Sequence, residues 1–229
     1  MSHSITLTDD YKLPTGVLRA TGVQRRLLGP LRNFVYILEY PEGSVVIDPH
    51  ADIKGWTPHL KGPLLAVLLT HTHHDHIGGM DWIFENTSSC IYMNDHELFR
   101  VGDWSKKYRD RIIYLNHNTL ISSLDIIAWH TPGHSHGALS YAFFSTQTEA
   151  PQVCTGDTLF VHDCGRTDLP TGSNHAMFET LQRFKRLPDN TILLPGHDYG
   201  PTPTSTIGAE RLYNPSFQCA TVEELAALE

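Results

Sequence analysis

Hydrophobic and polar positions predict a chain that is rich in strands at first and then alternates strands with helices. Short β-branched and aromatic runs at 34–38 and 45–47 flank Pro41-Glu42-Gly43, a pattern typical of a β-hairpin. The apolar run Leu64–Leu69 lies between Gly62-Pro63 and Thr70. An unbroken apolar run of this length predicts a strand that is buried on both faces.

The remaining pattern predicts further strands and four helices. The expected strands are 90–93, 125–129, 139–144, 151–155 and 192–194, and the expected helices are 80–85, 95–101, 174–187 and a short C-terminal one. Met177, Leu181 and Phe184 give helix 174–187 one apolar face, and Pro188 should end it. Thr221 and Glu224 form a capping box for the last helix. With no repeat or long linker, we expect one domain over residues 1–229, with sheets covered by helices and no separate C-terminal domain.

Composition and charge narrow the class of protein. The 229 residues are 40% hydrophobic and 10% aromatic, enough for a substantial core. With 17 basic and 25 acidic residues the net charge is −8, which argues against a nucleic-acid partner. Leu64–Leu69 is the longest apolar run, far below the roughly 20 residues of a membrane span, and Met1–Asp10 lacks the features of a signal peptide. We expect a soluble, cytoplasmic protein with a small-molecule substrate and no membrane partner; the sequence leaves its oligomeric state open.

Cysteine and histidine usage differ in what they indicate. The four cysteines are far apart and form no C-x-x-C pair, so neither a disulfide framework nor a thiolate zinc site is indicated. The 15 histidines are many for this length, and several cluster.

The densest cluster, His71-Thr72-His73-His74-Asp75-His76, follows the predicted buried strand directly. In extended backbone His71 and His73 point to the same side and can share one metal ion. Asp75 and His76 come next along the turn and can serve a second ion. Imidazole and carboxylate are common ligands of zinc and also suit iron.

Three later segments repeat the layout of a strand followed by a polar loop with one metal-binding residue type. They are Thr131-Pro132-Gly133-His134, Thr155-Gly156-Asp157-Thr158 and Pro195-Gly196-His197-Asp198-Tyr199. Each is weak alone. Together they predict a site assembled from loops at the ends of several strands.

The order of these motifs resembles the metallo-β-lactamase superfamily over residues 30–215. The resemblance implies an α/β (α+β) fold, the αββα sandwich, in which two mixed sheets flanked by helices carry metals at one edge. It implies that His71, His73 and His134 hold one metal, that Asp75, His76 and His197 hold the other, and that Asp157 bridges both.

Within the superfamily, segments 155–160, 164–168 and 195–199 resemble the type II glyoxalases, the hydroxyacylglutathione hydrolases. They also resemble the persulfide dioxygenases, which bind a single Fe²⁺ through positions matching His71, His134 and Asp157. Two departures stand out: Arg166-Thr167-Asp168 replaces a basic residue and a tyrosine used for glutathione, and the family's C-terminal helical domain has no counterpart. His136, where the family commonly has proline, has no explanation in the sequence.

The resemblance makes a binuclear thioester hydrolase, similar to hydroxyacylglutathione hydrolase, the leading expectation. Two Zn²⁺ ions, or iron or a mixed Fe/Zn pair, would share a bridging hydroxide that attacks the carbonyl carbon. Candidate catalytic residues are Asp75, Asp157 and Tyr199; Asp157 would orient the nucleophile, and Tyr199 could donate a hydrogen bond to the oxyanion. Candidate substrate-binding residues are Tyr199 and Arg166, although an ion pair between Arg166 and Asp168 is equally consistent with the sequence.

Other functions remain as alternatives. A mononuclear iron persulfide dioxygenase is the main one, and a lactonase or other ester hydrolase ranks lower. Gly133-His134-Ser135-His136-Gly137 matches the G-x-S-x-G motif of serine hydrolases, which requires a helix after the serine. Because a strand is predicted at 139–144, we interpret this match as a coincidence.

Overall fold

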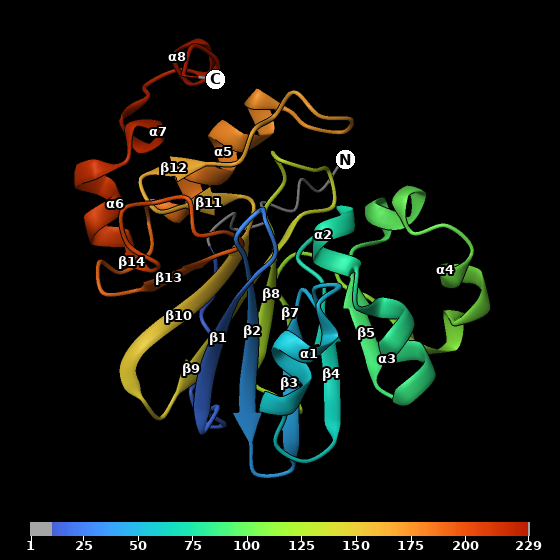
Figure 1. The fold of residues 1–229 in the computed structure, drawn as a ribbon. Helices are drawn as coiled ribbons and strands as arrows, with labels where there is room; N and C mark the ends of the chain where they lie inside the picture. The colour runs from blue at the N-terminus through green and yellow to red at the C-terminus, as the bar shows by residue number, and fades with distance from the viewer. Residues whose placement is uncertain (1–10, 229) are drawn as a thin grey trace, which may run out of the picture.

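The computed structural model describes residues 11–228, so the polar segment Met1–Asp10 lies outside the described residues. Two six-stranded sheets face each other and carry helices on their outer sides (Figure 1). In sheet order, the first sheet consists of β1 (Gly22–Leu28), β2 (Asn33–Tyr40), β3 (Gly43–Ile47), β4 (Leu64–Leu68), β5 (Cys90–Met93) and β6 (Ile112–Tyr114). The second consists of β14 (Ser205–Thr206), β13 (Ile192–Pro195), β10 (Thr148–Gly156), β9 (Leu139–Ser145), β8 (Ile126–His130) and β7 (Thr119–Ile121). The predicted αββα sandwich is confirmed.

Strand direction explains why loops from both sheets meet at one edge. Strands β3, β4, β5 and β6 run parallel, so the loops that follow them leave the first sheet on the same side. In the second sheet β10 and β13 also run parallel, and their following loops leave together. The other neighbouring pairs are antiparallel, which makes both sheets mixed. A small hairpin, β11 (Leu159–Phe160) and β12 (Asp163–Cys164), follows β10 at this edge.

Alternation along β2 shows how the layers pack. Phe34, Tyr36 and Leu38 point into the core between the sheets, whereas Val35 and Ile37 pack against the helices outside. Successive side chains of a strand point to opposite faces, and here both faces are buried. The unbroken apolar pattern of this segment follows from that double burial.

The helices divide between the two outer faces. On the side of the first sheet lie α1 (Ile53–Trp56), α2 (His74–Ile77), α3 (Met80–Asn86), α4 (Trp104–Lys107) and the 3-10 helices η1 (Thr57–His59), η2 (Asp95–Arg100) and η3 (Arg109–Arg111). On the side of the second lie α5 (Asn174–Phe184), α6 (Ile207–Tyr213), α7 (Pro215–Gln218) and α8 (Val222–Ala226). Within residues 11–228 no helix has the length and apolar character needed to cross a membrane.

Most predicted elements are present, with corrections at their ends. Helix α5 ends at Phe184, three residues before the predicted end at 187, so Pro188 is not what stops it. The predicted helix 95–101 is a 3-10 helix. The Thr221 side chain caps α8 by accepting from the Glu224 amide, but the Glu224 carboxylate accepts from the Ala220 amide instead of closing the box on Thr221.

Candidate metal centre

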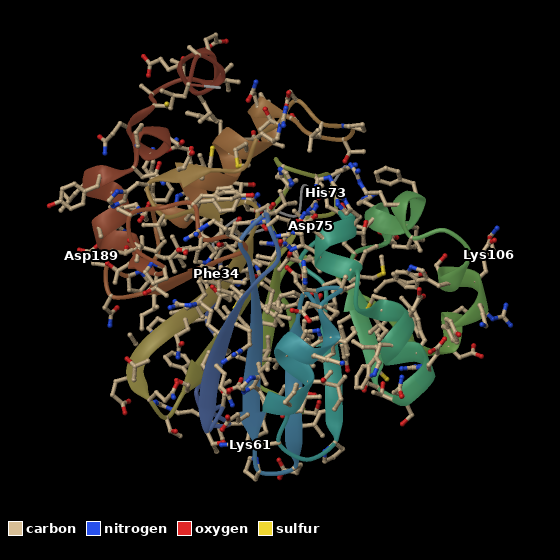
Figure 2. The ribbon with its side chains drawn as sticks, viewed as in Figure 1. Phe34, Lys61, His73, Asp75, Lys106 and Asp189 are labelled. Atoms are coloured by element: carbon tan, nitrogen blue, oxygen red, sulfur yellow. The ribbon has the colours of Figure 1, made fainter. Side chains whose placement is uncertain are left out.

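The loops that follow β4, β8, β10 and β13 meet at one edge of the sandwich. Figure 2 shows His73 and Asp75 there, beside the start of α2 and far from Lys61 at the opposite end. His73 is the N-cap of α2 and has extended backbone, so the chain leaves β4 extended and turns helical only at His74. Each of the four loops brings at least one predicted ligand to this edge.

Three histidines form a first group of potential ligands. His73 Nδ1 lies 2.9 Å from His71 Nε2 and 2.9 Å from His134 Nε2. The outer nitrogen of His134 bonds to a protein oxygen, since its Nδ1 donates to the Arg166 carbonyl at 2.8 Å. Donation from Nδ1 leaves a lone pair on Nε2, the nitrogen that faces the group.

A second group consists of Asp75, His76 and His197. The Nε2 atoms of His76 and His197 are 3.1 Å apart, and each is 3.4 Å from Asp75 Oδ2. His197 Nδ1 donates to the Leu31 carbonyl at 2.7 Å, which again leaves the inward Nε2 as an acceptor.

Asp157 lies between the two groups. Its Oδ2 is 3.2 Å from His197 Nε2 in the second group and 3.7 Å from His134 Nε2 in the first. Its Oδ1 is buried, 3.3 Å from His76 Nε2, and has no well-aligned hydrogen-bond partner among the described residues. The structure thus brings all seven predicted ligands together as two groups that share one carboxylate.

The residues fit a pair of divalent cations. Imidazole lone pairs that face one another at about hydrogen-bond distance repel unless a proton or a cation lies between them, and the donors are the nitrogen and oxygen types that zinc and iron accept. The orphaned Asp157 Oδ1 and a buried, unpartnered His73 Nε2 are further buried polar atoms that the described residues leave unsatisfied. Only the inward-facing Asp157 oxygen bears on the metals.

Protonation differs between the two groups. Burial lowers the pKa of His71 well below its ordinary value and that of His73 to about 4, so both imidazoles are neutral and can offer lone pairs. Burial also opposes a charge on His76, but Asp157 and Asp48 outweigh it and raise the pKa of His76 well above its ordinary value. Burial opposes the charge of Asp157 as well, yet the positive charge of His76 holds its pKa well below the usual range. A cation bound at the second group would displace the His76 proton.

Asp48 is a functional residue that the sequence analysis missed. It follows β3 with a left-handed backbone, φ 54°. Its carboxylate accepts from the Thr70 amide at 2.7 Å, the Thr70 hydroxyl at 2.5 Å and His76 Nδ1 at 2.9 Å. Asp48 also lies close enough to His71 and His76 to form a third potential ligand group, but its oxygens are already engaged. We therefore assign Asp48 to orienting His76; an acid directly after a predicted strand was the available signal.

The ligands open into a cavity of about 440 Å³. Its lining includes Leu31, Phe160, Arg166, Leu169 and Tyr199 as well as five of the seven predicted ligands, His73, Asp75, His134, Asp157 and His197. The Tyr199 ring stacks on His197 with centroids 4.6 Å apart, and 53% of the residue remains exposed. Burial, followed by the charge of Asp157, raises the pKa of Tyr199, so its hydroxyl stays protonated and can donate.

Arg166 faces the same cavity but is engaged by a neighbour. Its Nε and one terminal nitrogen each donate to a different oxygen of Asp168 at 2.6 Å. The structure thus contains the ion pair that the sequence left as an alternative to substrate binding.

The G-x-S-x-G match lacks the structural context of a nucleophile elbow. Ser135 is fully buried, and strand β9, not a helix, follows it. His136 is exposed and stacks on His96 with ring centroids 4.1 Å apart, an arrangement that explains its place but no function.

Comparison with known proteins decides the family. The sequence model of the metallo-beta-lactamase superfamily matches residues 28–197. The chain belongs to the metallo-β-lactamase superfamily. Two solved structures of this fold superpose on it. ETHE1 from Myxococcus xanthus has a TM-score of 0.72 at 23% identity over 90% of this chain and 89% of its own. TTHA1623 in a di-iron-bound form has a TM-score of 0.69 at 31% identity over 84% and 99%.

Superfamily relatives carry hydrolase names. A probable polyketide biosynthesis zinc-dependent hydrolase, PksB, from Bacillus subtilis (strain 168) is 29% identical over 193 residues, covering 81% of this chain and 82% of PksB. The hydroxyacylglutathione hydrolase of Pseudomonas savastanoi pv. phaseolicola (strain 1448A / Race 6) is 31% identical over 173 residues, 73% of this chain and 62% of its own length. The match therefore spans less than two thirds of that enzyme. Family and relatives together support a metal-dependent hydrolase.

Proposed function

We propose that this chain is a binuclear metal-dependent thioester hydrolase similar to the hydroxyacylglutathione hydrolases. The observation that carries the proposal is the pair of ligand groups that share Asp157 at the floor of an open cavity. The hydrolase names of the relatives and the di-iron form of a 31% identical structure support it. Two Zn²⁺ are the proposed ions, with iron or a mixed pair as alternatives.

The bound metals would lower the pKa of water toward 7 and polarise the substrate carbonyl. Asp157 keeps the two ligand groups at a fixed separation, because its Oδ2 faces one histidine of each. Asp75 stands on the side of the second group, where its Oδ2 faces both histidines of that group. These carboxylates thereby fix where the attacking water and the carbonyl carbon meet.

Tyr199 stands at the rim of the cavity with a protonated hydroxyl. From there it donates a hydrogen bond to the oxyanion that forms on the carbonyl oxygen. The thiolate leaving group of a thioester has a conjugate acid of pKa about 8.5, so it departs without a strong general acid. Among the described residues that line the cavity, no acid other than the ligands is available to protonate a leaving group, which suits this chemistry.

The cavity lining offers a substrate two kinds of contact, apolar and cationic. Leu31, Phe160 and Leu169 offer apolar contact for the acyl chain. Among the described residues that line the cavity, Arg166 is the one with a permanently charged cationic side chain. A substrate carboxylate must compete with Asp168 for it. A glutathione thioester would use Arg166 in this way.

A persulfide dioxygenase with a single Fe²⁺ is the second candidate. Its expected ligands His71, His134 and Asp157 are close together here, with His134 Nε2 3.7 Å from Asp157 Oδ2. This function leaves Asp75, His76 and His197 without a task, although they form a complete ligand group. We therefore rank it below the hydrolase.

Thiol release from S-lactoylglutathione by the zinc-loaded and the iron-loaded protein tests the proposal. Release by micromolar enzyme, lost on chelation and in Asp157→Asn, is the expected result, with Asp103→Asn as a matched control because that side chain is 98% exposed. Oxygen uptake on glutathione persulfide without thioester hydrolysis would favour the dioxygenase. Inactivity of every metal-loaded form on a panel of thioesters would refute the hydrolase.

A further inference from the structure

Two buried polar side chains outside the ligand set contact either a ligand or the loops that carry the ligands. Glu97 lies on η2, and Asn33 begins β2. Their exposed fractions are 1% and 3%. Neither belongs to a motif that the sequence analysis singled out.

Glu97 ties together the two loops that carry the first group. Its Oε2 accepts from the Thr72 amide at 3.0 Å and from the Thr72 hydroxyl at 2.8 Å. Its Oε1 accepts from the Gly137 amide at 3.0 Å. Thr72 lies between the ligands His71 and His73, and Gly137 lies three residues after His134, so one carboxylate spans both loops.

The contact between Glu97 and the two loops is close, and it requires a carboxylate at position 97. The partners of the two Glu97 oxygens are N–H and O–H donors, so both oxygens must accept. A Cβ at position 137 would lie 2.7 Å from Glu97 Cγ, which shows that the loop packs directly on this side chain. A buried carboxylate that only accepts from loop donors fixes the relative position of the loops.

Asn33 contacts the second group. Its Nδ2 donates to Asp75 Oδ2 at 2.8 Å. Its backbone forms a bridge with His197, and the next residue, Phe34, donates from its amide to the Gly196 carbonyl at 2.7 Å. Asn33 therefore links the loop of Asp75 to the loop of His197.

We propose that Glu97 positions the first metal site and Asn33 positions the second, so that each site can be weakened without the other. The inference rests on the two-site arrangement of the proposed function. Both are positioning residues: Glu97 acts on its ligands through the loops that carry them, and Asn33 acts through its hydrogen bond to Asp75 and its backbone bridge to His197.

Zn²⁺ titration against a competing chelator tests this inference, with Co²⁺ absorption as a second readout. Glu97→Gln places an amide N–H against either Thr72 or Gly137, and Asn33→Ala removes the donor to Asp75. Loss of a hydrogen-bond partner behind a metal ligand costs about 10–100-fold in affinity. We expect each variant to weaken one of the two binding steps by that factor and to leave the other within twofold.

A ligand variant identifies which step is affected. His134→Ala removes one ligand of the first group. In that background Glu97→Gln should not change the affinity of the remaining ion, whereas Asn33→Ala should still weaken it. Matched controls are Glu149→Gln, whose side chain is 90% exposed, and Asn86→Ala, which is exposed on α3. Both controls should bind two ions as the parent does.

Thr72→Val provides a milder variant that keeps the Glu97 carboxylate and removes only the hydroxyl donor. It should weaken the first step by about tenfold, and this result decides the role of Glu97 if Glu97→Gln does not fold. Equal weakening of both steps, or no weakening, would overturn the inference. If the parent protein itself fails to bind two ions, the proposed function fails instead.

Discussion

Asp48→Asn is the most informative single substitution outside the ligands. The Asp48 carboxylate accepts three hydrogen bonds, two from Thr70 and one from His76 Nδ1. Asparagine keeps one acceptor oxygen, which can still serve the Thr70 amide. Its NH₂ group then faces His76 Nδ1, which must accept. The His76 proton moves to Nε2, the nitrogen that faces His197 and the proposed second metal site.

The expected losses of metal affinity and of folding stability follow from these contacts. Removing a carboxylate behind a metal-binding histidine costs about 10–100-fold in metal affinity, equivalent to about 1.4–2.7 kcal/mol. The buried charge-assisted bonds to Asp48 are worth about 1.5–3 kcal/mol each, so the free energy of unfolding should also fall. The first site should change less, because Asp48 bonds to no histidine of that group except through Thr70.

Stepwise Zn²⁺ affinities and urea unfolding of the apoprotein measure both effects. Asp103→Asn, an exposed acid-to-amide change, is the control. If Asp48→Asn binds both ions as tightly as the parent, the tautomer argument is wrong. If the first step weakens and the second does not, Asp48 has been assigned to the wrong site.

Three further predictions follow from the same structure. In Gly165→Ala the new Cβ would lie 1.7 Å from the Asp157 carbonyl oxygen, so Asp157, the proposed bridging ligand, must move and elemental analysis should show lost metal; full occupancy would contradict this. Tyr199→Phe should lower kcat for thioesters about tenfold, the worth of one hydrogen bond to an oxyanion, with unchanged metal content; an unchanged kcat would remove Tyr199 from the mechanism. The bond from Lys61 lowers the pKa of Glu39 against the effect of burial, so this pair stabilises the fold above the ordinary carboxyl pKa of 4.5 and the contribution is lost as the pH falls through the lowered value. Glu39→Gln should therefore destabilise the protein by about 1 kcal/mol at pH 7 in urea unfolding, with less effect at pH 3, and an equal loss at both pH values would refute the assignment.

The ligand motif was accessible to sequence analysis because its logic is local. His71 and His73 follow a buried strand in extended backbone, which brings them to one side. His134, Asp157 and His197 each follow a strand that is apolar enough to recognise. The resemblance to a known family then supplied the grouping that local spacing alone left open.

The residues that hold the ligands were not accessible in the same way. Asp48, Asn33 and Glu97 act across contacts between segments far apart in the chain. Asp48 carried only the weak signal of an acid after a predicted strand, and Asn33 and Glu97 carried no local signal. Whether Arg166 pairs with Asp168 or with a substrate also depended on side-chain geometry. Sequence spacing allowed both.

Some strands were missed because their local hydrophobic pattern does not show that they pair with neighbouring strands in the folded protein. Strand β1 carries Gln24, Arg25 and Arg26 at the edge of the first sheet and shows no clear alternation, so it was not predicted. Strands β7 and β14 are too short to show a period. These segments are strands because neighbouring strands supply hydrogen-bond partners.

Elemental analysis of protein purified without chelator or added metal tests the binuclear site most directly. We predict close to two metal ions per chain, zinc, iron or a mixture, reduced to close to one in His134→Ala. A single iron per chain in the parent protein, unchanged by removal of His197, would contradict it, because the second ligand group would then hold nothing.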